Sequence, residues 1–228
     1  MHVIILFMKK LILVLCTLLC LVGCTDKPTP LPDEPDPNPL KEQYPEITGE
    51  CVMIDASQED IIAMLENGTG IVFFSWIDCP WCHGYIDMVN QAALDNGLTV
   101  LYYDIYNDRS ENSEFYQKVI SLISDYVDLF AYTADGESKA AYDSEGKPRI
   151  YVPYTVMVVK GKVIALDYQS SMESGFEENF EKFWNEEVAE GVTRRENTIA
   201  YFNDCFKTVK QEKDKIDEQG CDDNCKIG

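Results

Sequence analysis

Residues 71–83, IVFFSWIDCPWCH, join a hydrophobic segment to a pair of cysteines. The first seven residues form a continuous apolar run rich in β-branched and aromatic side chains, which is typical of a strand buried on both faces. The cysteines follow at once, and residues 79–97 have the composition of a helix that ends at Asn96-Gly97. The stretch therefore predicts a strand, a turn and a helix whose first residues carry two thiols.

The sequence CPWCH at residues 79–83 has four chemical interpretations. Two thiols spaced C-x-x-C form a redox dithiol, and C-x-x-C-H is also a haem attachment motif. Two thiols beside an imidazole could hold zinc. The fourth interpretation is an inert structural disulfide between Cys79 and Cys82.

Haem and zinc both need ligands that the rest of the chain does not clearly supply. A haem normally takes a distal Met or His, and the second histidine, His2, lies in an N-terminal segment that we expect to be removed. Zinc needs a fourth ligand, and nothing in the sequence brings Cys221 or Cys225 to the motif. We therefore favour the redox dithiol and expect neither a metal nor a cofactor.

The other expected elements extend from residue 50 to residue 217. Three strands alternating with helices predict a parallel sheet, and a hairpin turning at Lys160-Gly161 adds antiparallel strands. The strands are expected at about 51–54, 71–77, 98–106, 150–159 and 162–168, and the helices at 57–67, 79–97, 113–130, 176–189 and 194–217, with a polar loop at 131–149.

This order, with CPWC between the second strand and the second helix, resembles the thioredoxin-like family. That family has a cis-proline at the start of the first hairpin strand, beside the dithiol, and Val152-Pro153-Tyr154-Thr155 lies at the matching place. The resemblance covers residues 50–190. It implies an α/β, thioredoxin-like fold with a central mixed sheet flanked by helices, to which this chain adds an extra C-terminal helix.

Several positions depart from the family pattern. Phe73 stands where thioredoxins carry a buried acid, Asp87 stands where they have a proline, and region 107–149 is longer than usual. These differences favour a specialised exported relative, loosely similar to the bacteriocin transport accessory proteins, over a cytosolic thioredoxin.

The spacing of the motif assigns different roles to its residues. Cys79 is expected at the helix N-terminus, where unpaired N–H groups stabilise a nucleophilic thiolate, and Cys82 is the less exposed thiol that resolves the mixed disulfide. His83 is either a modulator of the Cys79 pKa or a solvated surface side chain. Trp81 is a substrate platform or simple cover, and Val152 and Pro153 are expected to contact a bound polypeptide, although Pro153 could be an ordinary edge-strand proline.

The N-terminal residues read as an export signal followed by a tether. Lys9-Lys10, an apolar run and Leu21-Val22-Gly23-Cys24 resemble a lipoprotein signal peptide at 1–24 with Cys24 as the lipidated residue; an uncleaved signal anchor is the alternative. Residues 25–44 hold six of the ten prolines and are expected to form an acidic linker. A domain at 45–190 and a C-terminal helical extension with a cysteine-containing tail at 191–228 should follow.

Charge and cysteine content agree with export. Loss of residues 1–24 removes two lysines and no acid, which takes the net charge from −21 to −23, and such a surface repels nucleic acid. An oxidising compartment favours disulfides, and we expect Cys221–Cys225 and Cys51–Cys205 among three possible pairings. Cys205 could instead be a buried thiol.

The sequence thus predicts a thiol-disulfide oxidoreductase that is lipid-anchored on the outer or periplasmic face of a bacterial membrane. Its partners would be protein or peptide thiols and disulfides and a redox partner protein. The direction of electron flow stays open. The alternative is a non-catalytic binding lipoprotein that keeps Cys79–Cys82 as a structural bridge, since a fold does not by itself define a function.

We predict that Cys24 becomes the acylated N-terminus of the mature protein. Cys24→Ala should leave an uncleaved or mislocalised precursor, because the anchoring residue is lost, while Cys16→Ala should be processed normally. Mass spectrometry of the N-terminal peptide from membrane fractions measures this, and an unmodified Cys24 there would contradict it.

Overall fold

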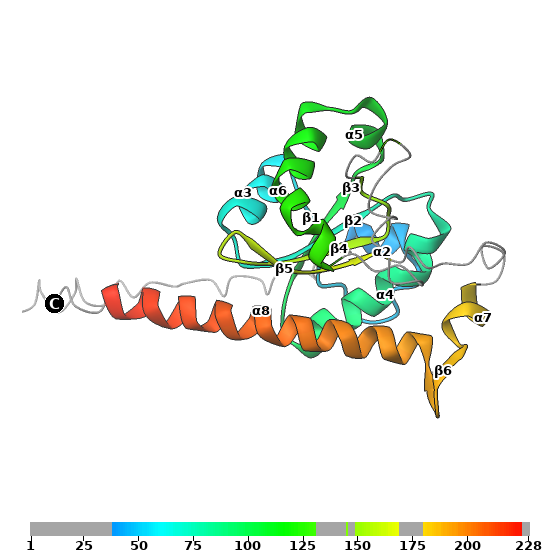
Figure 1. The fold of residues 1–228 in the computed structure, drawn as a ribbon. Helices are drawn as coiled ribbons and strands as arrows, with labels where there is room; N and C mark the ends of the chain where they lie inside the picture. The colour runs from blue at the N-terminus through cyan, green and yellow to red at the C-terminus, as the bar shows by residue number, and fades with distance from the viewer. Residues whose placement is uncertain (1–37, 131–144, 146–148, 169–179, 225–228) are drawn as a thin grey trace, which may run out of the picture. The chain divides into compact units, whose positions relative to one another are not determined.

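The computed structural model describes residues 38–130, 145, 149–168 and 180–224. Within them a five-stranded mixed sheet of order β1-β3-β2-β4-β5 is flanked by helices (Figure 1). The first three strands are mutually parallel and the last two are antiparallel, as the sequence predicted. The strands are β1 (Met53–Asp55), β2 (Gly70–Ser75), β3 (Val100–Asp104), β4 (Tyr154–Val159) and β5 (Lys162–Tyr168).

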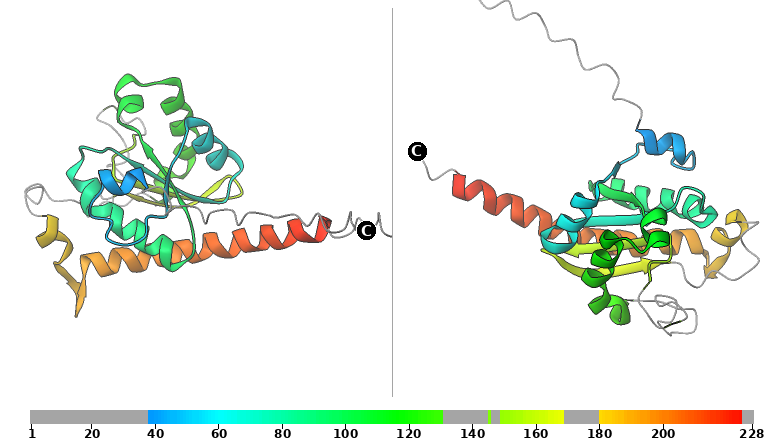
Figure 2. Two further views of the ribbon diagram at one scale, coloured as in Figure 1. Left: turned by 180° about the vertical axis from the view of Figure 1, so that it is seen from behind. Right: turned by 90° about the horizontal axis from the view of Figure 1, so that it is seen from above.

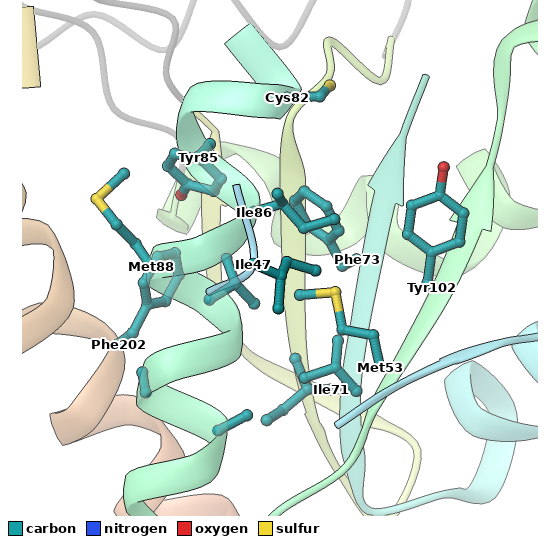
Figure 3. Packing of buried hydrophobic residues seen from close by; sticks show 14 of the residues in the cluster. Ile47, Met53, Ile71, Phe73, Cys82, Tyr85, Ile86, Met88, Tyr102 and Phe202 are labelled. Atoms are coloured by element: carbon teal, nitrogen blue, oxygen red, sulfur yellow. The ribbon is translucent and has the colours of Figure 1, made fainter. Parts of the chain in front are cut away.

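The central strand β2 is buried along its whole length. Ile71 and Phe73 belong to the hydrophobic cluster on the side of helix α4 (Pro80–Asp95), and Val72 and Phe74 belong to the cluster on the other side. Figure 3 shows Phe73 close to Ile86 of α4, and Ile71 beside Met53 of β1. The continuous apolar run predicted this two-sided burial, because alternate side chains of a strand point to opposite faces.

Two pairs of helices cover the sheet. Helices α3 (Gln58–Asn67) and α6 (Glu114–Phe130) lie on one face, and α4 and α8 (Arg194–Asn224) lie on the other (Figures 1 and 2). Helix α3 begins where the sequence predicted, with Ser57 and Asp60 forming a reciprocal capping box.

Strand β3 is shorter than predicted, because the chain turns into a short helix, α5 (Tyr106–Glu111). The carboxylate of Asp104 accepts hydrogen bonds from the backbone N–H groups of Tyr106, at 3.0 Å, and of Ile77, at 3.1 Å. This side chain ends the strand and ties it to the segment that follows β2. The expected loop at 131–149 lies almost wholly outside the described residues.

The folded part begins earlier than the expected linker boundary at residue 44. Helix α2 (Pro39–Gln43) starts at Asn38, whose side chain accepts from Leu40 N–H and donates to the carbonyl of Met53 at 2.8 Å. Leu40, Tyr44 and Ile47 are buried. Three apolar residues among prolines show no helical period, so no sequence pattern indicated that they join the core. The expected signal peptide and the first part of the linker lie outside the described residues.

The single helix expected at 176–189 is wrong in its second half. Helix α7 (Phe180–Trp184) ends early, and a hairpin of β6 (Glu187–Ala189) and β7 (Val192–Thr193) follows. Gly191 takes a φ of +69°, and its N–H donates to the Glu187 carboxylate at 2.7 Å. Glycine adopts this left-handed conformation at little cost, which favours the turn. Residues 176–179 lie outside the described part.

Helix α8 is part of the core and not an appendage, and it continues past the predicted end at residue 217. Phe202, Phe206 and Val209 are fully buried and belong to the cluster that contains β2 and α4. The expected boundary at 190/191 therefore divides a single packed unit. In the described part of the chain, no helix combines the length and apolar character that a membrane span requires.

We predict that Phe206→Ala lowers the free energy of unfolding by about 3–5 kcal/mol, because it leaves a cavity between α8 and the sheet. Ile216→Ala is the matched control: Ile216 lies on the same helix with 37% of its surface exposed, so its loss should cost about 0.5 kcal/mol or less. Urea denaturation measures both. Equal small effects would mean that α8 is not packed on the core.

Candidate functional site

The dithiol lies at the connection between β2 and α4. Cys79 is the N-cap of α4, with an extended backbone at φ −84° and ψ 110°, and Pro80 occupies the first turn, where a helix needs no N–H partner. Cys79 is 6% exposed and Cys82, inside the first turn, is fully buried. The structure therefore gives the two cysteines unequal access to solvent, with the first at the helix end.

The environments of the two thiols shift their pKa values in opposite directions. A hydrogen bond from Cys82 lowers the pKa of Cys79 to about 7; the N–H groups of Cys82 and Trp81 and the charge of His83 act in the same sense, against the effect of burial. Burial raises the pKa of Cys82, and the neighbouring Cys79 raises it further. Both residues are thiols in the structure. At neutral pH the pair thus holds its negative charge on Cys79.

His83 is held by two acceptors and is not simply solvated. Its Nδ1 lies 3.0 Å from Oε2 of Glu46, and its Nε2 lies 2.7 Å from the carbonyl of Ile77. Both partners of the ring are hydrogen-bond acceptors, and they fix its orientation from two sides. Glu46 was missed in the sequence, because it comes from a segment 37 residues away.

Val152 and Pro153 lie beside the dithiol. The Val152–Pro153 peptide bond is cis, as expected, and the carbonyl oxygen of Val152 is 4.0 Å from Sγ of Cys79. Strand β4 starts at Tyr154, after this bond, and not at Ile150 as predicted. The backbone of Val152 thus forms one side of the space around Cys79.

Aromatic side chains stand on both sides of the motif. Trp81 is half-buried and meets the ring of Phe183 edge-on, with centroids 5.3 Å apart. Trp76 stacks on Tyr106, with centroids 4.5 Å apart and planes 13° apart, and Tyr106 is 38% exposed. The Trp76–Tyr106 pair was not identified from the sequence, although the two residues come one and two positions after the ends of neighbouring parallel strands and so meet at the same sheet edge.

The expected Cys51–Cys205 disulfide is not formed in the structure, where both residues are half-buried thiols. The helical stripe placed Cys205 on the buried face of α8, but periodicity does not fix which residue it meets there. Burial raises the pKa of Cys51. The Cys221 side chain and all of Cys225 lie outside what the structure describes, as does Cys24.

Comparisons with family models, curated proteins and solved structures found no match to this chain. Among the described residues, no group of three or more His, Cys, Asp or Glu side chains has the arrangement of a metal site. What the site can do must therefore be argued from its own geometry.

We predict that alkylation of Cys79 by iodoacetamide has a half-maximal rate near pH 7, where an ordinary thiol would need about pH 9. The thiolate is the reactive form, so a lowered pKa moves the profile to lower pH. His83→Gln removes a charge that lowers this pKa and should move the midpoint upward by less than about one pH unit.

The control is Gln91→Ala, at an exposed position farther along α4, which should leave the profile unchanged. The measurement uses protein in which the cysteines other than Cys79 and Cys82 are serine, and peptide mass spectrometry to assign the adduct. A midpoint near pH 9 in the unsubstituted pair would contradict the charge distribution described here.

Proposed function

We propose that this protein is a thiol-disulfide oxidoreductase of thioredoxin-like fold, acting on protein or peptide substrates through Cys79 and Cys82. The observation that carries the proposal is the asymmetry of the pair. One thiol lies at a helix N-terminus with a pKa of about 7, and the other lies three residues later, fully buried, with a raised pKa. An inert structural bridge has no need of this difference.

The topology supports the thioredoxin-like part of the proposal. The dithiol stands between the second strand and the helix after it, the sheet ends in an antiparallel hairpin, and a cis-proline precedes the first hairpin strand. These are the features on which the resemblance in the sequence was based. These features lie together around Cys79, which agrees with the family resemblance.

The proposed reaction consists of two exchanges. The Cys79 thiolate attacks one sulfur of a substrate disulfide, forms a mixed disulfide and releases the other substrate sulfur as a thiolate. Cys82 then loses its proton and attacks Cys79 Sγ, which displaces the second substrate thiolate and leaves a Cys79–Cys82 disulfide. The proton of Cys82 is taken up by the departing sulfur. Two electrons pass to the substrate, and the reverse sequence oxidises a substrate dithiol.

The surroundings of Cys79 suit an extended polypeptide. The Val152 backbone stands on one side of the sulfur, and Trp81 and the Trp76–Tyr106 pair offer apolar surface nearby. Backbone and aromatic contacts favour a peptide over a small polar disulfide, because they recognise main chain and apolar side chains with little demand on sequence.

We also propose that the protein works outside the cytoplasm, held at the membrane by lipid on Cys24. The proposal rests on the sequence of residues 1–24, and on the proline-rich residues after them, which would place the domain at a distance from the lipid surface.

We predict that Cys82→Ala accumulates mixed disulfides with its substrates, because Cys79 can attack but nothing resolves the product. Cys79→Ala should trap almost nothing, since the remaining thiol is buried and holds its proton. Non-reducing electrophoresis and mass spectrometry of the adducts measure both variants and identify the partners.

Cys205→Ala is the control for the loss of a cysteine elsewhere and should behave as the unsubstituted protein. Adducts of equal abundance from both active-site variants would contradict the assigned roles. Absence of adducts from Cys82→Ala would favour a binding lipoprotein instead. The reduction potential of the pair against glutathione then decides whether it reduces or oxidises its substrates.

A further inference from the structure

A chain of buried hydroxyl groups leads away from Cys82. Ser75 is the last residue of β2, and its hydroxyl lowers the pKa of the Cys82 thiol, against the larger effect of burial. The hydroxyl oxygen of Tyr44 lies 3.0 Å from Oγ of Ser75 and 2.9 Å from the hydroxyl oxygen of Tyr102. All four side chains are buried. Figure 3 shows the Tyr102 hydroxyl pointing toward the end of the sheet where Cys82 lies.

The buried position of Cys82 creates a chemical difficulty. To resolve a mixed disulfide, this thiol must become a thiolate where burial opposes the charge. Ser75 lies two residues after Phe73 on the same face of β2, directed toward α4. No carboxylate is among the main groups that shift the pKa of Cys82 in the described part of the chain: Phe73 is apolar, and Asp104 acts on Tyr102 at the far end of the hydroxyl chain.

We propose that the hydroxyl chain Tyr102–Tyr44–Ser75 stabilises the Cys82 thiolate in the resolving step, with Ser75 as the donor to sulfur and the two tyrosines as positioning residues. The proposal rests on the function proposed above and adds to it the groups that make the second thiol reactive. It gives Tyr44, from the segment before the sheet, a role in the chemistry of the site.

The donor count fits this role. Each hydroxyl has one hydrogen to give and can accept. Tyr102 can donate to Tyr44, Tyr44 to Ser75 and Ser75 to the thiolate, so each hydrogen points toward the negative charge. Such a chain is polarised in one direction, and the last donor is strengthened by those behind it. Burial raises the pKa of Tyr102 to about 12 and that of Tyr44 further, so both hydroxyls keep their protons.

The hydroxyl chain has its largest effect on the Cys82 thiolate after the first exchange. In the reduced pair the Cys82 thiol donates to the Cys79 thiolate, which holds the proton in place. Once Cys79 is bonded to substrate, its charge and this acceptor are gone. The groups that still lower the pKa of Cys82 are the Ser75 hydroxyl and the backbone N–H of Trp76, and Tyr44 and Tyr102 follow Ser75 in the hydroxyl chain. The Cys82 proton leaves on the displaced substrate sulfur, so no hydroxyl of the chain gains or loses one.

The test separates the two exchanges in a single reaction. Protein that retains Cys79 and Cys82 as its cysteines is mixed with an aromatic disulfide whose thiolate product is coloured. The fast phase reports attack by Cys79 and the slow phase reports resolution by Cys82. Ser75→Ala should slow the second phase about tenfold and move its pH midpoint upward, because a hydrogen bond to a charged group is lost. The first phase should be unchanged.

Matched variants distinguish the effect of losing a hydroxyl group from the effect of changing the side-chain packing. Tyr44→Phe should slow the second phase in the same direction by a smaller factor. Tyr85→Phe removes a buried hydroxyl of the same hydrophobic cluster that has no hydrogen-bond partner among the described residues, and it should leave both phases unchanged. Ser75→Thr keeps the hydroxyl and adds a methyl group, so it should be nearer to the unsubstituted protein than Ser75→Ala. If the role of Ser75 were purely steric, Ser75→Ala would be nearer to the unsubstituted protein than Ser75→Thr.

A second measurement needs no substrate. In a Cys79→Ser background, the ultraviolet absorbance of the thiolate gives the pKa of Cys82 alone. Ser75→Ala should raise that pKa and Tyr85→Phe should not. The proposal would be overturned if the Cys82 pKa were the same with and without Ser75→Ala. It would also be overturned if the second phase were unchanged in both Ser75→Ala and Tyr44→Phe. Absence of any exchange together with a raised pKa in Ser75→Ala would refute the proposed function and leave the hydroxyl chain standing.

Discussion

The complete burial of β2 is the constraint on which the site depends. Helices cover both faces of this strand, so its end is fixed in three dimensions by contacts on each side. The chain leaves the sheet after Ser75, at this fixed point, and Cys79, the N-cap of α4, follows four residues later. A nucleophile on an exposed loop would need additional contacts to keep it beside Val152. Here the packed core of the domain holds Cys79 in that position.

The difference between the two thiols follows from their places at the start of α4. Cys79 lies at the rim, where N–H groups of the first turn point at its sulfur, and Cys82 lies one turn deeper, where burial dominates. The same helix therefore stabilises one thiolate and disfavours the other. Their mutual hydrogen bond sharpens the difference, since the proton that Cys82 keeps is the one that stabilises the charge on Cys79.

Local patterns in the sequence were sufficient for the sheet and for the start of α4. The apolar run at residues 71–77 predicted a buried strand, although β2 ends at Ser75, two residues before the predicted end. The proline after Cys79 marks the start of a helix. The supporting residues could not be found this way. Tyr44 meets Ser75 across 31 residues, and Glu46 meets His83 across 37. Such contacts have no period, and α2 sits among prolines that suggested an open linker.

The short segment from Tyr44 to Ile47 contributes to the surroundings of both thiols. The hydroxyl of Tyr44 lies in the chain that ends at Cys82, and two residues later Glu46 fixes His83, whose charge lowers the pKa of Cys79. The Tyr44 ring also packs on the His83 ring, with centroids 4.8 Å apart. A displacement of this segment would change both thiols together, and the C-x-x-C motif by itself would not reveal it. The chemistry of the pair thus depends on residues that precede the sheet as much as on the helix that carries the cysteines.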